Sequence, residues 1–247
     1  MHRRKPLLPI VTVFLLTAFI WASNLKSERA LASDILGHGE KLYSQNNEEL
    51  IIRDFFKDRK NGFFVDVGCM DYRNSSTTYY LEKHLGWSGI GVDALALFAD
   101  GFLRHRPNTR FFNFIVTDHS WSIETFHFAE EFAGVSSTDK EWVEKKEMLH
   151  VGRKKSRVLY IPTITLTDLL EKNGILTIDF LSMDIEGGEV AALNGFDIQR
   201  FRPKLACIEI SENTIDKILD YFSRHNYERI DKYMDYDKQN YYFRPKK

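Results

Sequence analysis

Four aspartates, Asp66, Asp93, Asp118 and Asp184, lie within or directly after short apolar runs, where their carboxylates could bind a ligand. In an open α/β sheet, ligands bind at the carboxyl ends of the strands, near the point where the strand order reverses. A carboxylate after a second strand can accept hydrogen bonds from both hydroxyls of a ribose, and one after a third strand can accept from an adenine amino group. One such acid is explained equally well as a turn or helix-cap residue. Four aspartates at such positions predict a nucleoside site, with Asp93 at the ribose and Asp118 at the adenine.

The sequence of the loop after the first apolar run indicates a nucleoside ligand without phosphates. A dinucleotide site would need G-x-G-x-x-G at this point, whereas residues 68–72 read GCMDY, with the single glycine Gly68. Without tight glycine turns or a helix start suited to pyrophosphate, S-adenosylmethionine is the candidate. We expect Gly68 to let the backbone approach this ligand closely, because a side chain there would collide with it.

The pattern of apolar runs predicts the elements that position these residues. Apolar runs and helical patterns alternate about every 25 residues, which is typical of βαβ units and a parallel sheet. Two closing strands, at residues 227–233 and 240–243, are expected to form an antiparallel hairpin at the sheet edge. The fold class is therefore α/β, with one doubly wound, mostly parallel sheet. The expected strands are 63–67, 87–93, 110–117, 178–183 and 205–210, and the expected helices are 44–59, 76–85, 95–105, 167–173, 189–194 and 213–225.

Residues 120–160 interrupt this alternation. Ser122–Ala129 alternates like an edge strand, Lys140–Lys155 is heavily charged, and Ser156–Ile164 reads as extended. We interpret the segment as an insertion or flexible loop over the top of the sheet, since long connections of this kind are often functional lids.

Several runs together resemble the FkbM-type methyltransferases. They are Gly62–Gly68 (GFFVDVG), Ser75–Thr77, Leu81-Glu82 before Gly86-Trp87, and Asp179–Glu189 (DFLSMDIEGGE). The resemblance spans about residues 43–210, and its D-I-E-G-x-E block is the most distinctive part. It implies a class I, Rossmann-like methyltransferase fold, S-adenosylmethionine as donor, and O-methylation of a hydroxyl on a sugar or small natural product.

The chain departs from the family pattern at two places. Asp93-Ala94 replaces a common Glu-Pro pair, which keeps the acid expected at the ribose. Cys69-Met70-Asp71 replaces a common Ala followed by Asn or Asp. We take Asp66, Gly68 and Asp71 of this loop, together with Asp93 and Asp118, as the expected donor-binding residues.

Methyl transfer to a hydroxyl needs alignment of donor and acceptor and a group that makes the hydroxyl nucleophilic. Asp184 and Glu186 are the expected catalytic residues, either one serving as general base. Several acids here could instead hold Mg²⁺, which prefers oxygen ligands. Glu189 is explained as a helix start favourable for the helix dipole, and Glu209 as a buried structural acid paired with Arg or Lys.

The first 33 residues form a separate segment, predicted as a signal peptide or membrane anchor before a domain at 34–247. Arg3, Arg4 and Lys5 precede the uncharged stretch Leu7–Ala22, which is slightly short for a spanning helix. Ala30–Ala32 offers a cleavage site, so cleavage and anchoring both remain open. The flanking charges place the body outside the cytoplasm, which conflicts with a donor that is made in the cytosol.

Composition limits the partners of this 247-residue chain. A formal net charge of −1 gives no basic surface for nucleic acid, so we expect a small-molecule or saccharide acceptor instead. Two alternatives stay open, a membrane-tethered methyltransferase-like binding protein without catalytic activity and a nucleotide-sugar enzyme on the same sheet.

Overall fold

The computed structural model describes residue 35 and residues 37–247. The chain divides into two units, Met1–Glu40 and Lys41–Lys247. In the first unit, the His38 N–H donates to the Ile35 carbonyl. The predicted N-terminal segment at residues 1–33 lies outside the described residues. Within the part that is described, no helix has both the length and the apolar character needed to cross a membrane.

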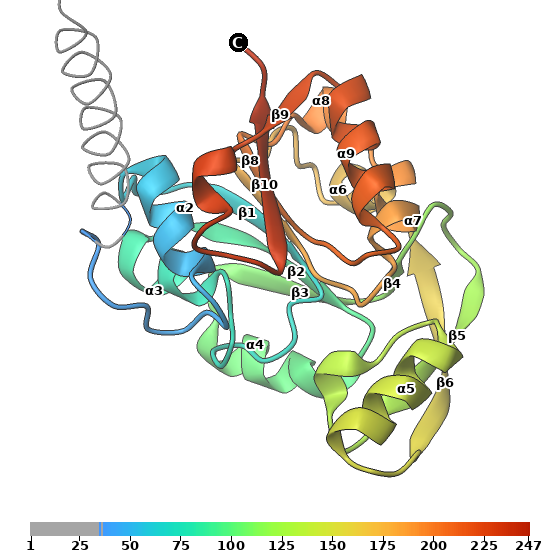
Figure 1. Ribbon diagram of the computed structural model, residues 1–247. Helices are drawn as coiled ribbons and strands as arrows, with labels where there is room; N and C mark the ends of the chain where they lie inside the picture. Colours follow the sequence, from blue (N-terminus) through green and yellow to red (C-terminus); the bar gives the residue numbers. More distant parts are fainter. Residues whose placement is uncertain (1–34, 36) are drawn as a thin grey trace, which may run out of the picture. The chain divides into compact units, whose positions relative to one another are not determined.

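A seven-stranded sheet in the order β3-β2-β1-β7-β8-β10-β9 forms the centre of the second unit (Figure 1). The strands β3, β2, β1, β7 and β8 are parallel, and β10 runs antiparallel to β8 and β9. The predicted doubly wound sheet with an antiparallel edge is thereby confirmed. The strands are β1 (Phe63–Val67), β2 (Ser88–Asp93), β3 (Thr109–Asn113), β7 (Phe180–Met183), β8 (Leu205–Glu209), β9 (Tyr227–Arg229) and β10 (Asn240–Pro245).

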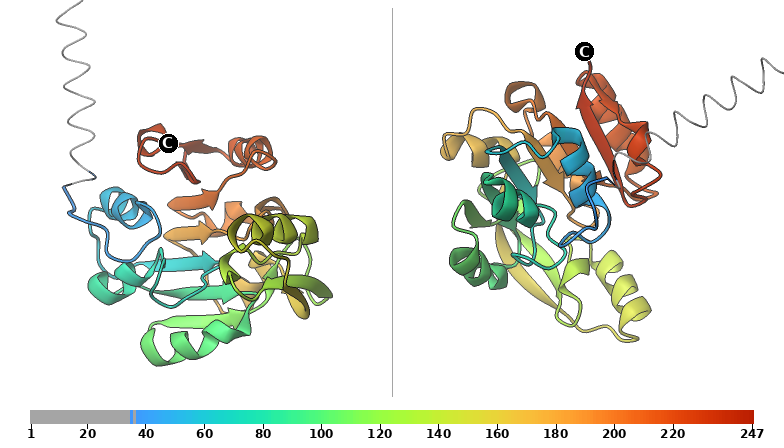
Figure 2. Two further views of the ribbon diagram at one scale, coloured as in Figure 1. Left: turned by 60° about the horizontal axis from the view of Figure 1, so that its bottom comes forward. Right: turned by 90° about the vertical axis from the view of Figure 1, so that its left-hand side faces the viewer.

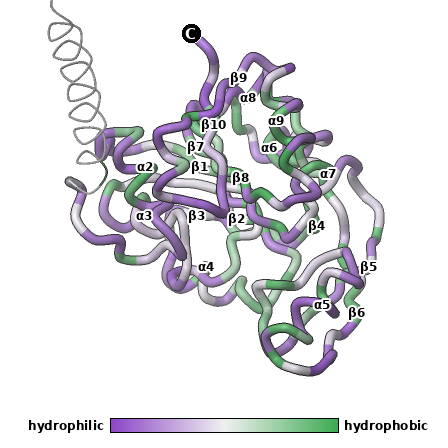
Figure 3. Tube along the Cα trace, in the orientation of Figure 1, coloured by the Kyte–Doolittle hydropathy of each residue, from purple (hydrophilic) through white to green (hydrophobic). Residues whose placement is uncertain are grey.

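Helices cover both faces of this sheet, α2, α3 and α4 on one face and α6 to α9 on the other (Figure 2). Val65 and Val67 of β1 pack in one core with Leu170, Leu193 and Phe222 of the second group. Figure 3 shows hydrophobic residues along β8, which is buried in the middle of the sheet. The helices are α2 (Glu48–Phe56), α3 (Tyr79–Leu85), α4 (Ala99–His105), α6 (Leu166–Lys172), α7 (Glu189–Asn194), α8 (Ile198–Phe201) and α9 (Ile215–Arg224), with 3₁₀ turns η1 (Ala96–Phe98), η2 (Ala133–Val135) and η3 (Asp231–Tyr233).

The register of the sheet brings three candidate residues into one row. Val67 lies opposite Val92 of β2 on one side and opposite Met183 of β7 on the other. The residues that follow, Gly68, Asp93 and Asp184, therefore leave the sheet at the same level. The strand order reverses between β1 and β7, so this row marks the topological switch point at which α/β proteins bind ligands.

Two predicted helix starts are wrong by a few residues. Ser44 does not occupy the N-cap of α2, which begins at Glu48, although its hydroxyl accepts a hydrogen bond from the Glu49 N–H at 3.2 Å. Thr165 caps α6 by accepting from the Asp168 N–H, whereas the predicted cap Thr167 donates its hydroxyl to the Gly195 carbonyl. At α6 a second threonine therefore takes the capping position that the sequence assigned to Thr167.

The predicted third strand is divided, and its second part belongs to another sheet. After β3 the chain turns at Phe114, and β4 (Ile115–Val116) pairs in parallel with β6 (Ser156–Ile164). The antiparallel partner of β6 is β5 (Ile123–Ala129), the predicted edge strand. Residues 120–160 are thus an insertion with a sheet of its own, in the order β4-β6-β5.

The charged segment within this insertion is helical, so its prediction as a flexible loop is wrong. The helix α5 (Lys140–His150) is capped by Asp139, whose side chain accepts from the N–H groups of Glu141 and Trp142. Its Val143 is buried against β5 and η2. Charges on the exposed positions concealed this narrow apolar face in the sequence.

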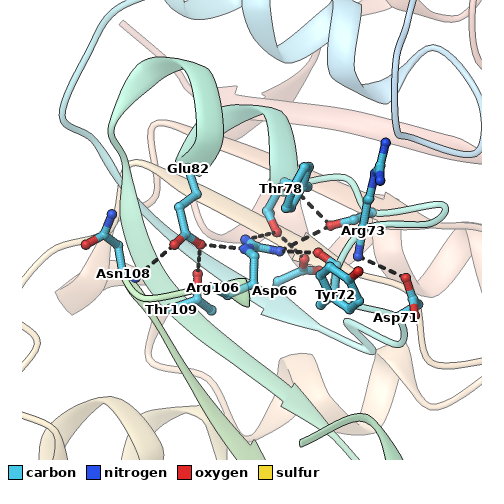
Figure 4. Close-up of polar contacts among 11 residues, drawn as sticks. Asp66, Asp71, Tyr72, Arg73, Thr78, Glu82, Arg106, Asn108 and Thr109 are labelled. Carbon is cyan, nitrogen blue, oxygen red and sulfur yellow. Dashed lines mark hydrogen bonds and ion pairs between the residues drawn. The ribbon is translucent and has the colours of Figure 1, made fainter. Parts of the chain in front are cut away.

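A buried ion pair fixes the loop between β1 and α3. The Arg106 side chain is fully buried and donates from Nε to Glu82 of α3, from one terminal nitrogen to the Tyr72 carbonyl, and from the other to the Thr78 hydroxyl (Figure 4). Thr78 in turn donates to Asp66 at 2.7 Å. The network therefore ties α3, the β1 loop and the β1 strand together from below.

We predict that Arg106→Met lowers the free energy of unfolding by about 3–5 kcal/mol, because removing one partner leaves the other charge buried and unpaired. Arg104→Met is the matched control. Arg104 is exposed and pairs with the exposed Asp100, so its substitution should change stability by less than about 1 kcal/mol. Urea unfolding measures both, and an equal effect of the two substitutions would contradict the assignment.

Candidate active site

A cavity of about 710 Å³ opens at the carboxyl ends of β1, β2 and β7. Its lining combines the row defined by the sheet register with residues of the insertion. The lining includes Gly68, Met70, Asp93, Phe98, Phe114, Glu131, Phe132, Lys146, His150, Asp184, Glu186 and Glu209. A volume of this size suits a drug-sized ligand together with part of a second one.

Asp93 lies at the end of β2 and faces the cavity. One carboxylate oxygen accepts from the Leu95 N–H at 2.8 Å and the other from the Met70 N–H at 3.0 Å. These two bonds fix the plane of the carboxylate, and each oxygen keeps a lone pair for a further donor. Burial raises the pKa of Asp93 to about 6. This geometry suits the predicted contact with two ribose hydroxyls.

Gly68 is required by the protein's own backbone. Its φ of +80° favours glycine, and a Cβ here would lie 1.8 Å from the Asp184 carbonyl oxygen. We had expected the side chain to be excluded by the ligand. The structure shows that the β1 and β7 chains already approach each other too closely for any side chain, and Gly68 also lines the cavity.

Asp66, Asp71 and Asp118 do not line the cavity. Asp66 is buried beneath it in the Arg106 network, and burial raises its pKa to about 6. Asp71 accepts hydrogen bonds from the N–H groups two and three residues further along its own loop. Asp118 is exposed and pairs with His119, which also contacts Glu124. The structure thus brings Asp93 and Gly68 to the cavity and leaves these three residues outside it.

Asp184, Glu186 and Glu209 form a cluster in the lining of the cavity, at the ends of β7 and β8. One carboxylate oxygen from each lies within 4.8 Å of the others. Asp184 is exposed and lines the cavity. Burial raises the pKa of Asp184, although its hydrogen bond with Glu209 opposes the rise. Burial, followed by the charges of Asp184 and Glu186, raises the pKa of Glu209 to about 10. Asp184 and Glu209 are close enough to share a proton, and the expected cation partner of Glu209 is replaced by another acid.

Glu186 occupies a turn that its neighbours hold in place. Its φ is +53°, a conformation that costs a non-glycine residue of order 1–3 kcal/mol. Burial, followed by the charge of Asp184, raises the pKa of Glu186 to about 7. The Trp142 indole N–H donates to its carboxylate at 3.1 Å, and the Ser137 hydroxyl donates to its carbonyl at 2.9 Å.

Glu189 has the structural role that we expected. It begins α7, and its carboxylate accepts from the N–H groups of Ile185 and Gly187. These bonds shape the turn that carries Glu186.

Our sequence reasoning missed the contribution of the insertion to the cavity. Lys146 and His150 of α5 line it together with Glu131 and Phe132. The many charges around α5 are typical of a solvated surface, and their spacing does not indicate that one side of this helix lines a cavity. Among the described lining residues, Lys146 and His150 supply the basic side chains. A diphosphate would find few cations here and several carboxylates, which disfavours the nucleotide-sugar alternative.

Comparison with known protein families finds a match over most of the chain. The family model of the methyltransferase FkbM domain matches residues 66–229. No curated protein matches the chain.

Several solved structures are similar in fold. A TehB-like SAM-dependent methyltransferase from Corynebacterium glutamicum aligns with a TM-score of 0.46 at 14% identity, covering 91% of this chain and 97% of that one. A precorrin-6y C5,15-methyltransferase from Geobacter metallireducens aligns with a TM-score of 0.42 at 9% identity, covering 77% and 76%. A SAM-dependent methyltransferase from Geobacter sulfurreducens in complex with S-adenosyl-L-homocysteine aligns with a TM-score of 0.38 at 10% identity, covering 85% and 78%.

We predict that Asp93→Asn weakens the binding of S-adenosylmethionine at least about tenfold, because an amide cannot accept from two hydroxyls with both of its terminal atoms. In the wild-type protein the affinity should fall as the pH is lowered through about 6, since protonation removes the acceptor-only carboxylate. Isothermal titration from pH 5 to 8 measures both effects.

Asp118→Asn is the matched control, because Asp118 lies outside the cavity lining. Its affinity should stay within about twofold of the wild type, well under the 1.4 kcal/mol of a tenfold change. A larger loss of donor affinity in Asp118→Asn than in Asp93→Asn would mean that Asp118, and not Asp93, binds the donor.

Proposed function

This chain belongs to the FkbM methyltransferase family, and from this premise we propose that it transfers a methyl group from S-adenosylmethionine to a hydroxyl of a saccharide or small natural product. One observation carries the proposal. Asp93 and the cluster of Asp184, Glu186 and Glu209 line the same cavity on different strand ends. One wall suits a ribose, and the other suits an acceptor hydroxyl that must lose a proton.

The residues present fit the donor. Asp93 offers two fixed carboxylate oxygens, and Phe98 and Phe114 supply apolar surface in the same lining. Among the lining residues that the structure describes, only Lys146 and His150 are basic, which is few for a phosphate. When bound, S-adenosylmethionine supplies a methyl group on a positively charged sulfur. The acidic walls favour a cation in this cavity.

Glu186 is the residue that we assign to proton removal. A general base works best with a pKa near the working pH, and the pKa of Glu186 is raised to about 7. Asp184 and Glu209 share a proton and keep the cluster from carrying three charges. Their remaining oxygens can accept hydrogen bonds from an acceptor hydroxyl and orient it toward the donor.

Mg²⁺ held by the same carboxylates is the second possibility for activating the hydroxyl. Carboxylate oxygens are its preferred ligands, and one oxygen from each of the three side chains lies within 4.8 Å of the others. Such an ion would stabilise an alkoxide directly. A chelator distinguishes the two possibilities, because it would abolish the activity only if Mg²⁺ activates the hydroxyl.

The acceptor that we propose is neutral. Carboxylates outnumber basic groups among the described residues of the lining, so a uronic acid or a sugar phosphate would meet like charge. Neutral hydroxyl-rich molecules would find many acceptors and no repulsion.

We also propose that residues 1–33 direct a domain formed by residues 34–247 to a membrane or out of the cytoplasm, as the basic and apolar sequence suggests. Protease protection in intact cells and in lysed cells tests this directly. Equal digestion in both would place the domain outside the cytoplasm, and protection only in intact cells would place it inside.

The proposed activity predicts transfer of label from methyl-labelled S-adenosylmethionine to methyl glycosides of hexoses, 6-deoxyhexoses and pentoses, analysed as O-methyl products. A reaction on one of these glycosides supports the proposal. The absence of donor binding at millimolar S-adenosylmethionine in isothermal titration would overturn it.

Glu186→Gln should lower the rate of transfer at least about a hundredfold, which is the contribution of a general base, with donor affinity unchanged. The wild-type rate should rise with pH through about 7, because the base acts in its unprotonated form. Glu144→Gln on α5, which pairs with Lys154 outside the cavity, is the control. Loss of activity with EDTA and its recovery with Mg²⁺ would instead favour the metal.

A further inference from the structure

Two side chains of the insertion hold Glu186, one through its carboxylate and the other through its backbone carbonyl. The Trp142 indole N–H donates to the carboxylate of Glu186 at 3.1 Å, and the Ser137 hydroxyl donates to its backbone carbonyl at 2.9 Å. One bond fixes the end of the side chain and the other fixes the peptide unit. Residues more than 40 positions away in the sequence therefore fix both the backbone and the side chain of Glu186.

Glu186 needs such support because its backbone is in a left-handed conformation. Its φ of +53° is followed by Gly187 at +98°, so the turn depends on contacts with its surroundings. From within its own loop, Glu189 bonds only backbone N–H groups of the turn. The contacts to the Glu186 carboxylate and carbonyl described above come from the insertion.

The insertion is itself built to hold Trp142 and Ser137 in place. Ser137 is buried and exchanges two backbone hydrogen bonds with His127 of β5. Asp139 caps α5 at the turn that carries Trp142. At the far end of the helix, the buried Glu147 accepts from the N–H groups of Lys155 and Ser156 at the start of β6. These contacts anchor α5 at both of its ends.

Lys146 adds a charge to the same support. Its ammonium lies 4.1 Å from the centre of the Trp142 ring and lines the cavity with Glu186. Stacked on the indole, it favours the ionised form of the neighbouring acids.

We infer that Trp142 and Ser137 are positioning residues that hold Glu186 toward Asp184 and Glu209, so that helix α5 of the insertion completes the active site. The inference rests on the proposed function, because it gives Glu186 the task of removing a proton. It predicts that loosening α5 lowers the rate of transfer without affecting the donor site around Asp93.

Trp142→Phe tests the inference, since it removes the indole N–H and keeps most of the ring. Trp121→Phe is the matched control, because Trp121 is exposed and lies outside the cavity lining. Three quantities are measured in both variants. They are hydrogen–deuterium exchange of the 184–188 turn, the dissociation constant of S-adenosylmethionine, and the rate of transfer to the methyl glycoside that the wild type methylates fastest.

We expect faster exchange of the 184–188 turn and at least a tenfold lower rate in Trp142→Phe, with donor affinity within twofold of the wild type and no change in Trp121→Phe. Ser137→Ala should give the same pattern with a smaller loss, and it covers the case in which Trp142→Phe fails to fold. Unchanged exchange, or faster exchange at an unchanged rate, would overturn the positioning role.

Failure of the proposed function gives a different result. If the wild type transfers no label to any glycoside, that function is lost, while the exchange measurement still decides whether α5 holds the turn. Equal losses of donor affinity and rate would also overturn the inference, because they would mean that Trp142 supports the cavity as a whole.

Discussion

Three carboxyl groups, those of Asp184, Glu186 and Glu209, meet within 4.8 Å at one wall of a partly closed cavity. At an effective dielectric constant of about 20, two charges at that distance repel by about 3 kcal/mol. Burial is the largest cause that raises the pKa of each member, and for Glu186 and Glu209 the charge of Asp184 adds to it. A carboxylate that is ready to take a proton near pH 7 is the chemical result, and the surrounding fold must hold the groups together against their repulsion.

Contacts within the fold hold both the acid cluster and the donor side of the cavity in place. The close approach of Gly68 to the Asp184 carbonyl locks β1 against β7, and Glu189 shapes the turn that follows. On the donor side, Asp93 ties the β1 loop to β2, and the buried Arg106 network holds the same loop from beneath. Both walls of the cavity thus rest on buried polar groups that have partners, which is the condition under which such groups are tolerated in an interior.

Much of this arrangement is readable from the sequence, because strands buried on both faces leave continuous apolar runs and the acids that follow them mark the sheet's carboxyl edge. The sequence predicts Asp93, Asp184 and Glu186 as site residues in this way, and all three line the cavity. Asp118 was not placed correctly at the cavity, because the third apolar run is divided at Phe114 and its second part leaves the main sheet. The pairing of Glu209 with Asp184 depends on the register between β7 and β8, which periodicity does not determine. The role of α5 could not be predicted because its contacts to Glu186 span more than 40 residues.

The central claim is that donor and acid cluster share one cavity, with the ribose at Asp93 and the sulfur toward Asp184 and Glu186. A crystal structure of the protein with S-adenosylhomocysteine measures this most directly. The account predicts both ribose hydroxyls within hydrogen-bond distance of the Asp93 carboxylate, with the sulfur facing the cluster. A ribose bound at Asp118, or a product molecule outside this cavity, would contradict it.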